Sequence, residues 1–322
     1  MRNLFIAFIF LIVAYSCTKE YDLQIKSNQA GIVVDGTITN QKGPYLIRLT
    51  KSRFKLHFEQ RANASDTSYS YTTSDDGVIA IQDAEVYITD KNTSFTDTLE
   101  KCPTGKWVHY KDPNSDFVKS YFFVADTSII MGYYKTTKIK GIPGHTYALT
   151  IKWENQEYHA ESYMPIVPAL DSVQFKLVKG DIGKDDHNIP LIYFKEPLNE
   201  RNYYLFKTQA VYGWPYSILS DEYLGSYVNG LDVCKGVTPD YWLTNYPYDH
   251  TGSYFIEIHS ITREAYEYYK ALIQQFKTDG GGYSPSPASP PTNLDNGALG
   301  FFRASAVNRV DFKKDENHQW TW

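Results

Sequence analysis

The sequence predicts a mainly β protein, in which an N-terminal immunoglobulin-like β-sandwich is followed by a second β-rich domain carrying one amphipathic helix. Three observations predict this fold class. Apolar and polar residues alternate with a period of two in many short stretches from residue 31 onward. The 28 Tyr outnumber the 17 Phe and 6 Trp, and tyrosine suits half-buried pleated surfaces. One good helical pattern follows Thr262, and the 322 residues suffice for about two domains.

The first predicted domain covers residues 26–165. Residues 31–39 and 45–50 both alternate, and the turn at 40–44 between them predicts a hairpin with one face toward a core. The same alternation recurs in three later segments, at residues 84–88, 147–151 and 158–162. Short strands with regular turn signals and no intervening helix favour a sandwich over a parallel sheet. The polar stretch 60–76 interrupts the pattern and predicts either an exposed binding loop or disorder.

The second predicted domain covers residues 166–322 and follows a proline-containing linker at 164–168. Further strands are expected at residues 173–177, 191–194, 203–206, 254–258 and 307–312. A helix is expected near 262–277, because aromatic and aliphatic residues gather on one face of that segment. Thr262 can cap this helix, and Gly280 begins the glycine run that ends it.

The N-terminus predicts an export signal over residues 1–16. A basic start precedes an apolar run of about ten residues, which is too short to span a bilayer. Ser16 directly before Cys17 resembles a bacterial lipobox, so we expect cleavage there and lipidation of Cys17; the alternative is an ordinary secretory signal. Residues 17–25 then form a lipidated tether. Its Lys19, followed by acidic residues, resembles the export signal of outer-leaflet Bacteroidetes lipoproteins, which predicts an outer-membrane protein facing the cell exterior.

A series of short motifs runs in order along about 300 residues. Besides Cys17, these motifs are Ile32–Gly36, Gly43–Tyr45, Ala84–Val86, Gly144 with Tyr147 and Leu149, Tyr158–Ala160, Met164–Pro168 with Leu170–Val173, Asn202–Tyr204, Pro290–Asn293 and Asn296–Phe302. Their order is similar to that of a family of Bacteroidetes lipoproteins catalogued as the domain of unknown function 4249. The resemblance implies an outer-membrane lipoprotein, often encoded beside a TonB-dependent outer-membrane transporter. It brings no catalytic residues.

Composition and motifs point away from several classes of function. The formal net charge is -5, and no clustered Lys/Arg run supplies a local basic field, so we expect no nucleic-acid partner. No nucleophile elbow, zinc-binding helix, phosphate-binding loop or dinucleotide fingerprint is present, and the eight His are scattered. The sequence therefore predicts neither an enzyme nor a cofactor or metal site.

Cys102 and Cys234 are the two cysteines left after Cys17. Outside the cytoplasm they either form one disulfide between the two domains or remain two separate buried thiols.

An aromatic-rich stretch between residues 212 and 248 is the strongest binding signal. Its candidate ligand- or partner-binding residues are Trp214, Tyr216, Tyr223, Tyr227, Tyr241, Trp242, Tyr246 and Tyr248. Aromatic rings on loops can stack on a glycan or pack against a peptide or another partner, whereas the alternative is that they fill the second core.

Together these observations predict a non-catalytic outer-membrane lipoprotein, held by its lipid anchor and acting as an accessory binding component of a TonB-dependent nutrient uptake system. Its ligand would be a glycan, a peptide or a metal complex. Two alternatives stay open, namely an adhesive or structural surface lipoprotein and a surface hydrolase with an unrecognised site.

Overall fold

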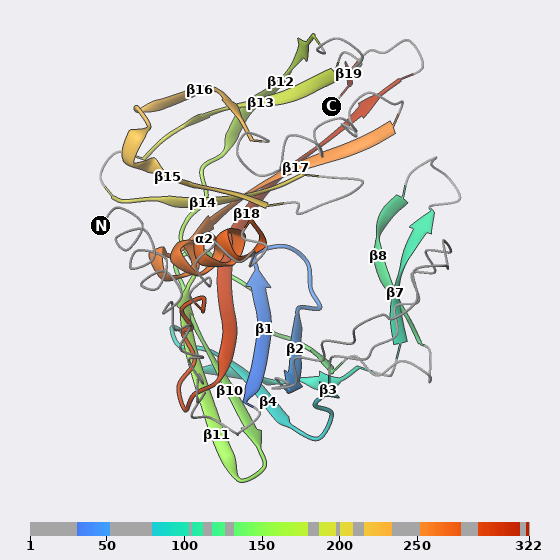
Figure 1. The fold of residues 1–322 in the computed structure, drawn as a ribbon, viewed down its shortest axis with the longest axis vertical. Coiled ribbons are helices and arrows are strands. Elements are labelled where there is room, and N and C mark those ends of the chain that lie inside the picture. The colour runs from blue at the N-terminus through green and yellow to red at the C-terminus, as the bar shows by residue number, and fades with distance from the viewer. Residues whose placement is uncertain are drawn as a thin grey trace, which may run out of the picture.

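The computed structural model describes residues 31–51, 79–102, 105–111, 118–125, 132–179, 187–197, 200–208, 216–233, 252–277, 289–315 and 320–321. These residues form a mainly β structure with one α-helix, α2, which confirms the predicted fold class (Figure 1). The predicted signal peptide, Cys17, the tether and the polar stretch 60–76 lie outside the described residues.

Ten of the described strands form one sheet, in the order β15-β14-β17-β18-β1-β2-β9-β6, with β19 paired to β18 and β3 to β2. Their bounds are β1 Ile32–Thr39, β2 Leu46–Lys51, β3 Ile79–Ala80, β6 Glu100–Lys101, β9 Tyr133–Lys135, β14 Tyr203–Thr208, β15 Tyr216–Ser220, β17 Gly252–Ile261, β18 Leu299–Lys314 and β19 Trp320–Thr321. Three smaller sheets accompany it, in the orders β11-β10-β4-β5, β12-β13-β16 and β7-β8. Their strands are β4 Glu85–Asp90, β5 Phe95–Thr98, β7 Gly105–Lys111, β8 Val118–Ala125, β10 Thr146–Trp153, β11 Gln156–Tyr163, β12 Leu170–Val178, β13 His187–Lys195 and β16 Tyr227–Asp232.

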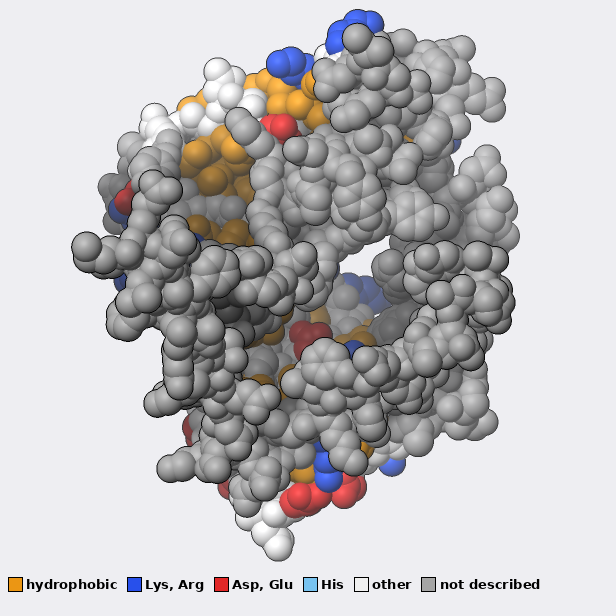
Figure 2. Space-filling view, viewed as in Figure 1, with side chains coloured by type: hydrophobic (Ala, Val, Ile, Leu, Met, Phe, Trp, Pro, Cys, Tyr) orange, Lys and Arg blue, Asp and Glu red, His pale blue; other side chains and the backbone are white. Residues whose placement is uncertain are grey.

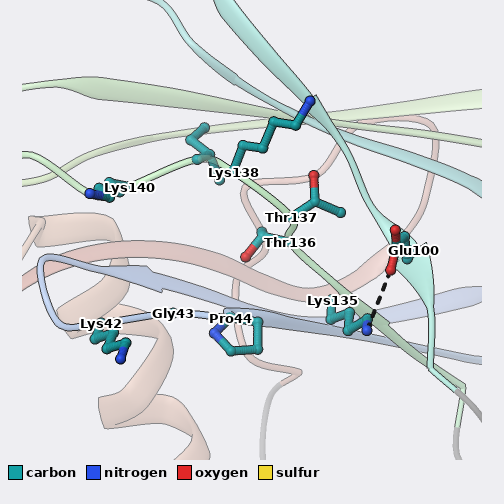
Figure 3. Close-up of a pocket in the computed structure, with 10 residues that line it drawn as sticks. Lys42, Gly43, Pro44, Glu100, Lys135, Thr136, Thr137, Lys138 and Lys140 are labelled. Carbon is teal, nitrogen blue, oxygen red and sulfur yellow. Dashed lines mark ion pairs between the residues drawn. The ribbon is translucent and has the colours of Figure 1, made fainter.

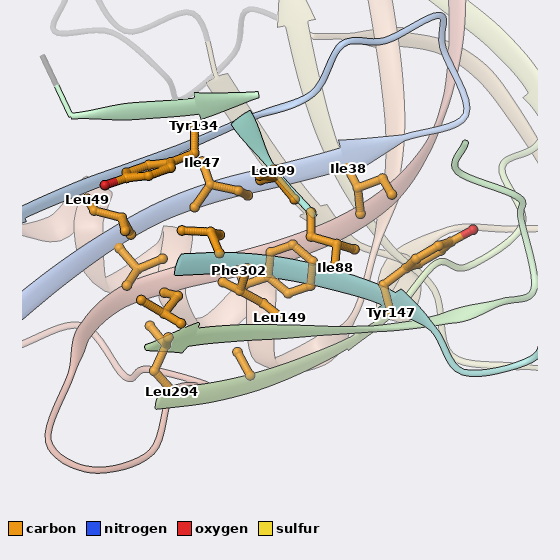
Figure 4. Packing of buried hydrophobic residues seen from close by; sticks show 14 of the residues in the cluster. Ile38, Ile47, Leu49, Ile88, Leu99, Tyr134, Tyr147, Leu149, Leu294 and Phe302 are labelled. Atoms are coloured by element: carbon orange, nitrogen blue, oxygen red, sulfur yellow. The ribbon is translucent and has the colours of Figure 1, made fainter. Parts of the chain in front are cut away.

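The N-terminal part of the chain builds a sandwich-like pair of sheets. β1 and β2 form the predicted antiparallel hairpin, and alternate residues of β1 are buried, as its alternating sequence requires. β10 pairs with both β11 and β4 to make the facing sheet. Figure 4 shows side chains from the two sheets meeting in one core, among them Ile47 of β2, Ile88 of β4 and Leu149 of β10.

Strand β18 completes this first core from the far end of the chain. Its first half pairs in parallel with β1, and its second half pairs antiparallel with β17 (Figure 1). Phe302 and Ala304 therefore lie in the first hydrophobic cluster, and Leu294, which bridges to Ala160 before β18 begins, lies there too, although all three were predicted to belong to the second domain. Gly300 has a φ of +90° and passes so close to β1 that a Cβ there would collide with the Val34 carbonyl oxygen.

A second hydrophobic cluster lies between the β12-β13-β16 sheet and the β14-β17-β18 part of the large sheet. Phe194 of β13 and Tyr204 of β14 meet in it with ring centroids 5.6 Å apart. Val167, in the predicted linker, packs against both clusters. The large sheet thus runs through both cores, and β18 is the strand that the two cores share.

The helix α2, Arg263–Lys277, contacts β14, β15 and β18 (Figure 1). The Thr262 hydroxyl accepts a hydrogen bond from the backbone N–H of Ala265 at 3.3 Å, which confirms the predicted cap. Glu264 and Glu267 are exposed, whereas Ala265 is fully buried. The helix thereby covers the face of the large sheet opposite to the two cores.

Candidate functional site

One described cavity lies beside β2, β6 and β9 and has a volume of about 510 Å³. Three segments line it, namely the turn between β1 and β2, the start of β6, and the stretch from the end of β9 to residue 140 (Figure 3). Its lining residues are Lys42, Gly43, Pro44, Glu100, Lys135, Thr136, Thr137, Lys138, Ile139 and Lys140. We call this feature the lysine cavity, because four of these side chains are lysines.

A buried carboxylate holds one wall of the lysine cavity. Asp97 of β5 accepts hydrogen bonds from the backbone N–H groups of Thr137, Lys138 and Ile139 at 2.8, 2.8 and 3.0 Å, and one from the Thr137 hydroxyl. Burial by itself would raise the pKa of Asp97, but these hydrogen bonds outweigh burial and hold its pKa below the usual value. The carboxylate is therefore ionised at neutral pH and fixes the backbone that carries the lysines.

Tyr45 joins the turn between β1 and β2 to the stretch that follows β9. Its backbone N–H donates to the Thr136 hydroxyl at 2.8 Å, and its carbonyl accepts from the Thr136 N–H at 3.0 Å. Its own hydroxyl donates to the Gln41 carbonyl at 2.7 Å and accepts from the Gly141 N–H at 3.2 Å. The backbone on both sides of the cavity is thus held by a buried tyrosine and a buried threonine.

The charge in the lysine cavity is mostly positive. Lys135 pairs with Glu100 at 3.4 Å, while Lys42, Lys138 and Lys140 are exposed. In Figure 3 the ammonium groups of these three lysines point in different directions and not toward one point. Such an arrangement suits an extended anionic partner better than a single small ion, because each ammonium group can meet a different negative group.

The sequence analysis did not identify this cavity and noted no clustered Lys/Arg run. Pairing of β2 with β9 places Leu46 opposite Lys135, which brings the 42–44 turn beside the lysines of residues 135–140. The three lysines within residues 135–140 are the one sequence pattern that could have indicated part of this cavity. Lys42 enters only through the tertiary pairing.

A family model described as a domain of unknown function (DUF4249) matches residues 18–310. The chain belongs to this family. The match spans the first hydrophobic cluster, most of the second and most of the shared strand β18 of the DUF4249 chain, and it ends before Phe312 of the second cluster. No curated protein matches the chain.

The predicted aromatic site of the DUF4249 chain is only partly within the described residues. Five of its eight members lie outside them, namely Trp214, Tyr241, Trp242, Tyr246 and Tyr248. The backbone of Tyr216 lies in β15, and that of Tyr223 lies in the short 3-10 helix Asp221–Tyr223. Whether these residues bind a ligand stays a prediction.

Tyr227 is the one member of that set whose side chain the structure describes. It lies at the start of β16 and is 48% exposed. Partial desolvation, the charge of Asp171 and a hydrogen bond to that carboxylate raise the pKa of Tyr227. Leu177 of β12 is also exposed, and Figure 2 shows hydrophobic side chains at the surface over this upper part of the DUF4249 chain. Tyr227 therefore belongs to a surface and not to the second core.

Cys102 is buried, its burial raises the pKa of its thiol, and its predicted partner Cys234 lies outside the described residues. The disulfide therefore stays a prediction. Within the described ranges, no group of three or more His, Cys, Asp or Glu side chains could hold a metal ion. None of the described helices is long and apolar enough to cross a membrane.

Proposed function

We propose that this DUF4249 chain is a non-catalytic binding lipoprotein of the outer membrane, anchored through Cys17, that serves as an accessory of a TonB-dependent uptake system. The observation that supports a binding role is the lysine cavity, whose walls are fixed by Asp97 and Tyr45. Its ligand is an extended anionic molecule, such as an acidic glycan.

The chemistry of the lysine cavity favours binding. Three of its ammonium groups are exposed and therefore hydrated, so they attract an anion at modest energy and at a rate that falls with salt. Each such contact is worth roughly 0.2–1 kcal/mol. Several weak contacts on a fixed backbone give reversible capture, which suits a protein that must pass its cargo on.

The lipid anchor would raise the effective concentration of this binder near a transporter in the same membrane. The lipobox at Cys17 and the export signal beside it support such an anchor. A Cys17→Ser variant is expected to leave the membrane fraction, because it cannot receive the acyl chains. Retention of that variant in the outer membrane would contradict the anchoring proposed here.

The lysine cavity is tested with purified protein and an immobilised acidic polysaccharide such as polygalacturonate. Lys138→Gln/Lys140→Gln is expected to weaken binding roughly 2- to 30-fold, because two surface charges are lost. The matched control is Lys91→Gln/Lys152→Gln, which removes two exposed lysines from outside the cavity. Equal losses in both double variants would show that only net charge matters and would remove the cavity from the proposal.

The transport role is tested by native pull-down from detergent-solubilised outer membranes with a C-terminal tag. Recovery of one transporter in near-equal amount supports the accessory role, and that transporter then identifies the class of cargo. Recovery of the lipoprotein alone contradicts the accessory role and points to a free-standing binder, adhesin or hydrolase.

A further inference from the structure

The face of the large sheet that α2 partly covers carries a polar cluster, which reaches the turn between β1 and β2 through Gln41. Glu257 and His259 of β17 are both buried, and the His259 Nε2 lies 3.0 Å from the Glu257 carboxylate. The same carboxylate accepts from Arg309 of β18 at 3.1 Å and from Gln41 at 3.2 Å. These partners fully engage Glu257. Burial alone would raise the pKa of Glu257, but the hydrogen bond and charge of His259 and the charge of Lys207 outweigh burial and lower this pKa to about 2.

Arg303 of β18 lies on this same face and is only 4% exposed. Within the described part of the chain, its Nε and Nη1 are buried and have no hydrogen-bond partner. Its guanidinium carbon lies 5.3 Å from the centroid of the Tyr269 ring of α2, a contact that stabilises the cation but satisfies no N–H group. A buried cation with unpaired donors is strongly destabilising, so native proteins retain one where a partner compensates it.

The described charged groups around Arg303 are of both signs, namely Lys207, Arg309, Glu257 and Asp35. Lys207 of β14 is half-buried, and its pKa is lowered by burial and then by the charge of Arg303. Burial lowers the pKa of His259 to about 4, so this imidazole is neutral at pH 7. Asp35 of β1 is exposed, and Glu257 is engaged by Arg309, Gln41 and His259. Among the described residues, neither carboxylate therefore satisfies the buried Nε–H and Nη1–H groups of Arg303.

We propose that Arg303 anchors a buried binding site for an oxyanion group, a carboxylate or a phosphate, between α2 and the paired strands β1 and β18. The Nε–H and Nη1–H groups donate to the oxyanion, as charge-assisted hydrogen bonds of this kind are the strong ones. Tyr269 holds the guanidinium from the helix side. The β1 side gives access, because Thr37, which pairs with Arg303, is half-buried and Asp35 is exposed.

This site differs from the lysine cavity in what it selects. The lysine cavity offers exposed and hydrated ammonium groups, whereas the Arg303 site offers a desolvated guanidinium that can bind one defined anionic group. The two proposals rest on different residues, so either can fail without the other.

The test measures thermal unfolding of the full chain in detergent, in sodium chloride and in ionic-strength-matched sodium acetate or sodium phosphate at about 20 mM. An anion that binds only the folded state raises the Tm. We expect one of the two anions to raise the Tm of the wild type relative to chloride. A response to acetate alone assigns a carboxylate, and a response to phosphate alone assigns a phosphate.

Arg303→Met keeps an unbranched apolar side chain of similar length and removes the charge. This variant is expected to lose the rise in Tm that the anion causes in the wild type. In chloride its Tm is expected to equal or exceed that of the wild type, because the buried unpaired cation has been removed. The matched control is Arg309→Met on the same strand, whose guanidinium already pairs with Asp311 at 2.7 Å. The control is expected to unfold at a lower Tm and to keep the anion response.

Three results would overturn the proposal. The first is a wild type that responds to neither anion, and the second is an Arg303→Met variant that keeps the response. The third is an Arg303→Met variant that is destabilised in chloride or fails to fold, since Arg303 would then already have a partner within its own chain.

Discussion

Replacing Phe302 by alanine tests whether the C-terminal strand β18 is part of the first core. Phe302 is 0% exposed and lies between the two sheets of the first unit (Figure 4). A phenylalanine buries at least about 150 Å², which at about 25 cal/mol per Å² gives roughly 4 kcal/mol. This value lies within the 3–5 kcal/mol range typical of Phe→Ala in cores. For a domain of about 150–250 residues, such a loss lowers the Tm by roughly 8–16 °C.

The cavity left by this substitution cannot collapse easily. Gly36 of β1 pairs with Phe302, and a Cβ at Gly36 would already lie 3.2 Å from the Phe302 ring and 2.6 Å from the Ile47 side chain. The sheets on both sides are fixed by their ladders, so the loss is expected at the upper part of the range.

Urea denaturation and hydrogen exchange together measure this effect. The exchange of β1 and β2 amides is expected to accelerate more than that of β12 and β13 amides, because the cavity lies in the first core. The matched control is Phe95→Ala, whose side chain is 43% exposed and which should cost less than about 1 kcal/mol. A Phe302→Ala variant within about 1 kcal/mol of that control would refute the assignment of β18 to the first core.

Three further substitutions test particular contacts. Asp97→Asn is expected to lower the free energy of unfolding by about 2 kcal/mol at pH 7, because a charged acceptor of three backbone N–H groups is lost. The pKa of Asp97 in the folded protein lies below 3.8, the ordinary value of the unfolded chain. The ionised carboxylate therefore stabilises the folded state fully above that pH, and this stabilisation is lost as the pH falls through the pKa of the folded state. The difference between wild type and variant, measured by urea denaturation, should therefore shrink below about pH 3.8, and a constant difference would contradict the role of this charge. Gly300→Ala forces a Cβ against the Val34 carbonyl at a φ of +90°, so it should lower the free energy of unfolding by at least about 1–3 kcal/mol and lower the Tm. An unchanged Tm would show that β1 and β18 do not approach each other as described. Thr262→Ala removes the hydroxyl that caps α2 at the Ala265 N–H and should lower the free energy of unfolding by about 1 kcal/mol. The helical signal in circular dichroism should fall as well. Unchanged stability and an unchanged signal would show that this cap is not formed.

Much of the local structure could be predicted from the sequence. The hairpin of β1 and β2, the hairpin of β10 and β11 and the capped helix α2 are all local features, whose apolar period and turn residues lie within one continuous segment. The family was also identified from short motifs, since their order along the chain is specific even where each motif is weak.

The candidate sites were much less accessible to sequence reasoning. The sequence analysis chose aromatic residues, and of these only Tyr227 has a described side chain, which lies on the surface. The lysine cavity and Arg303 were not predicted, because Lys42 joins the lysines of residues 135–140 only through strand pairing and a lone arginine in a strand carries no local pattern.

The sequence by itself determined the strand-rich fold class, the position of the helix and the expectation of an exported, lipidated protein at Cys17. The alternation of side chains and the turn residues suffice for these, since they act over a few residues. Only the tertiary structure decided that β18 joins both cores and that Lys42 meets the lysines of residues 135–140. It also decided that two N–H groups of Arg303 are buried without a hydrogen-bond partner among the described residues. Each of these depends on pairing between segments distant in sequence, and a period of two shows that a residue is on one face of a strand but not which strand will lie beside it.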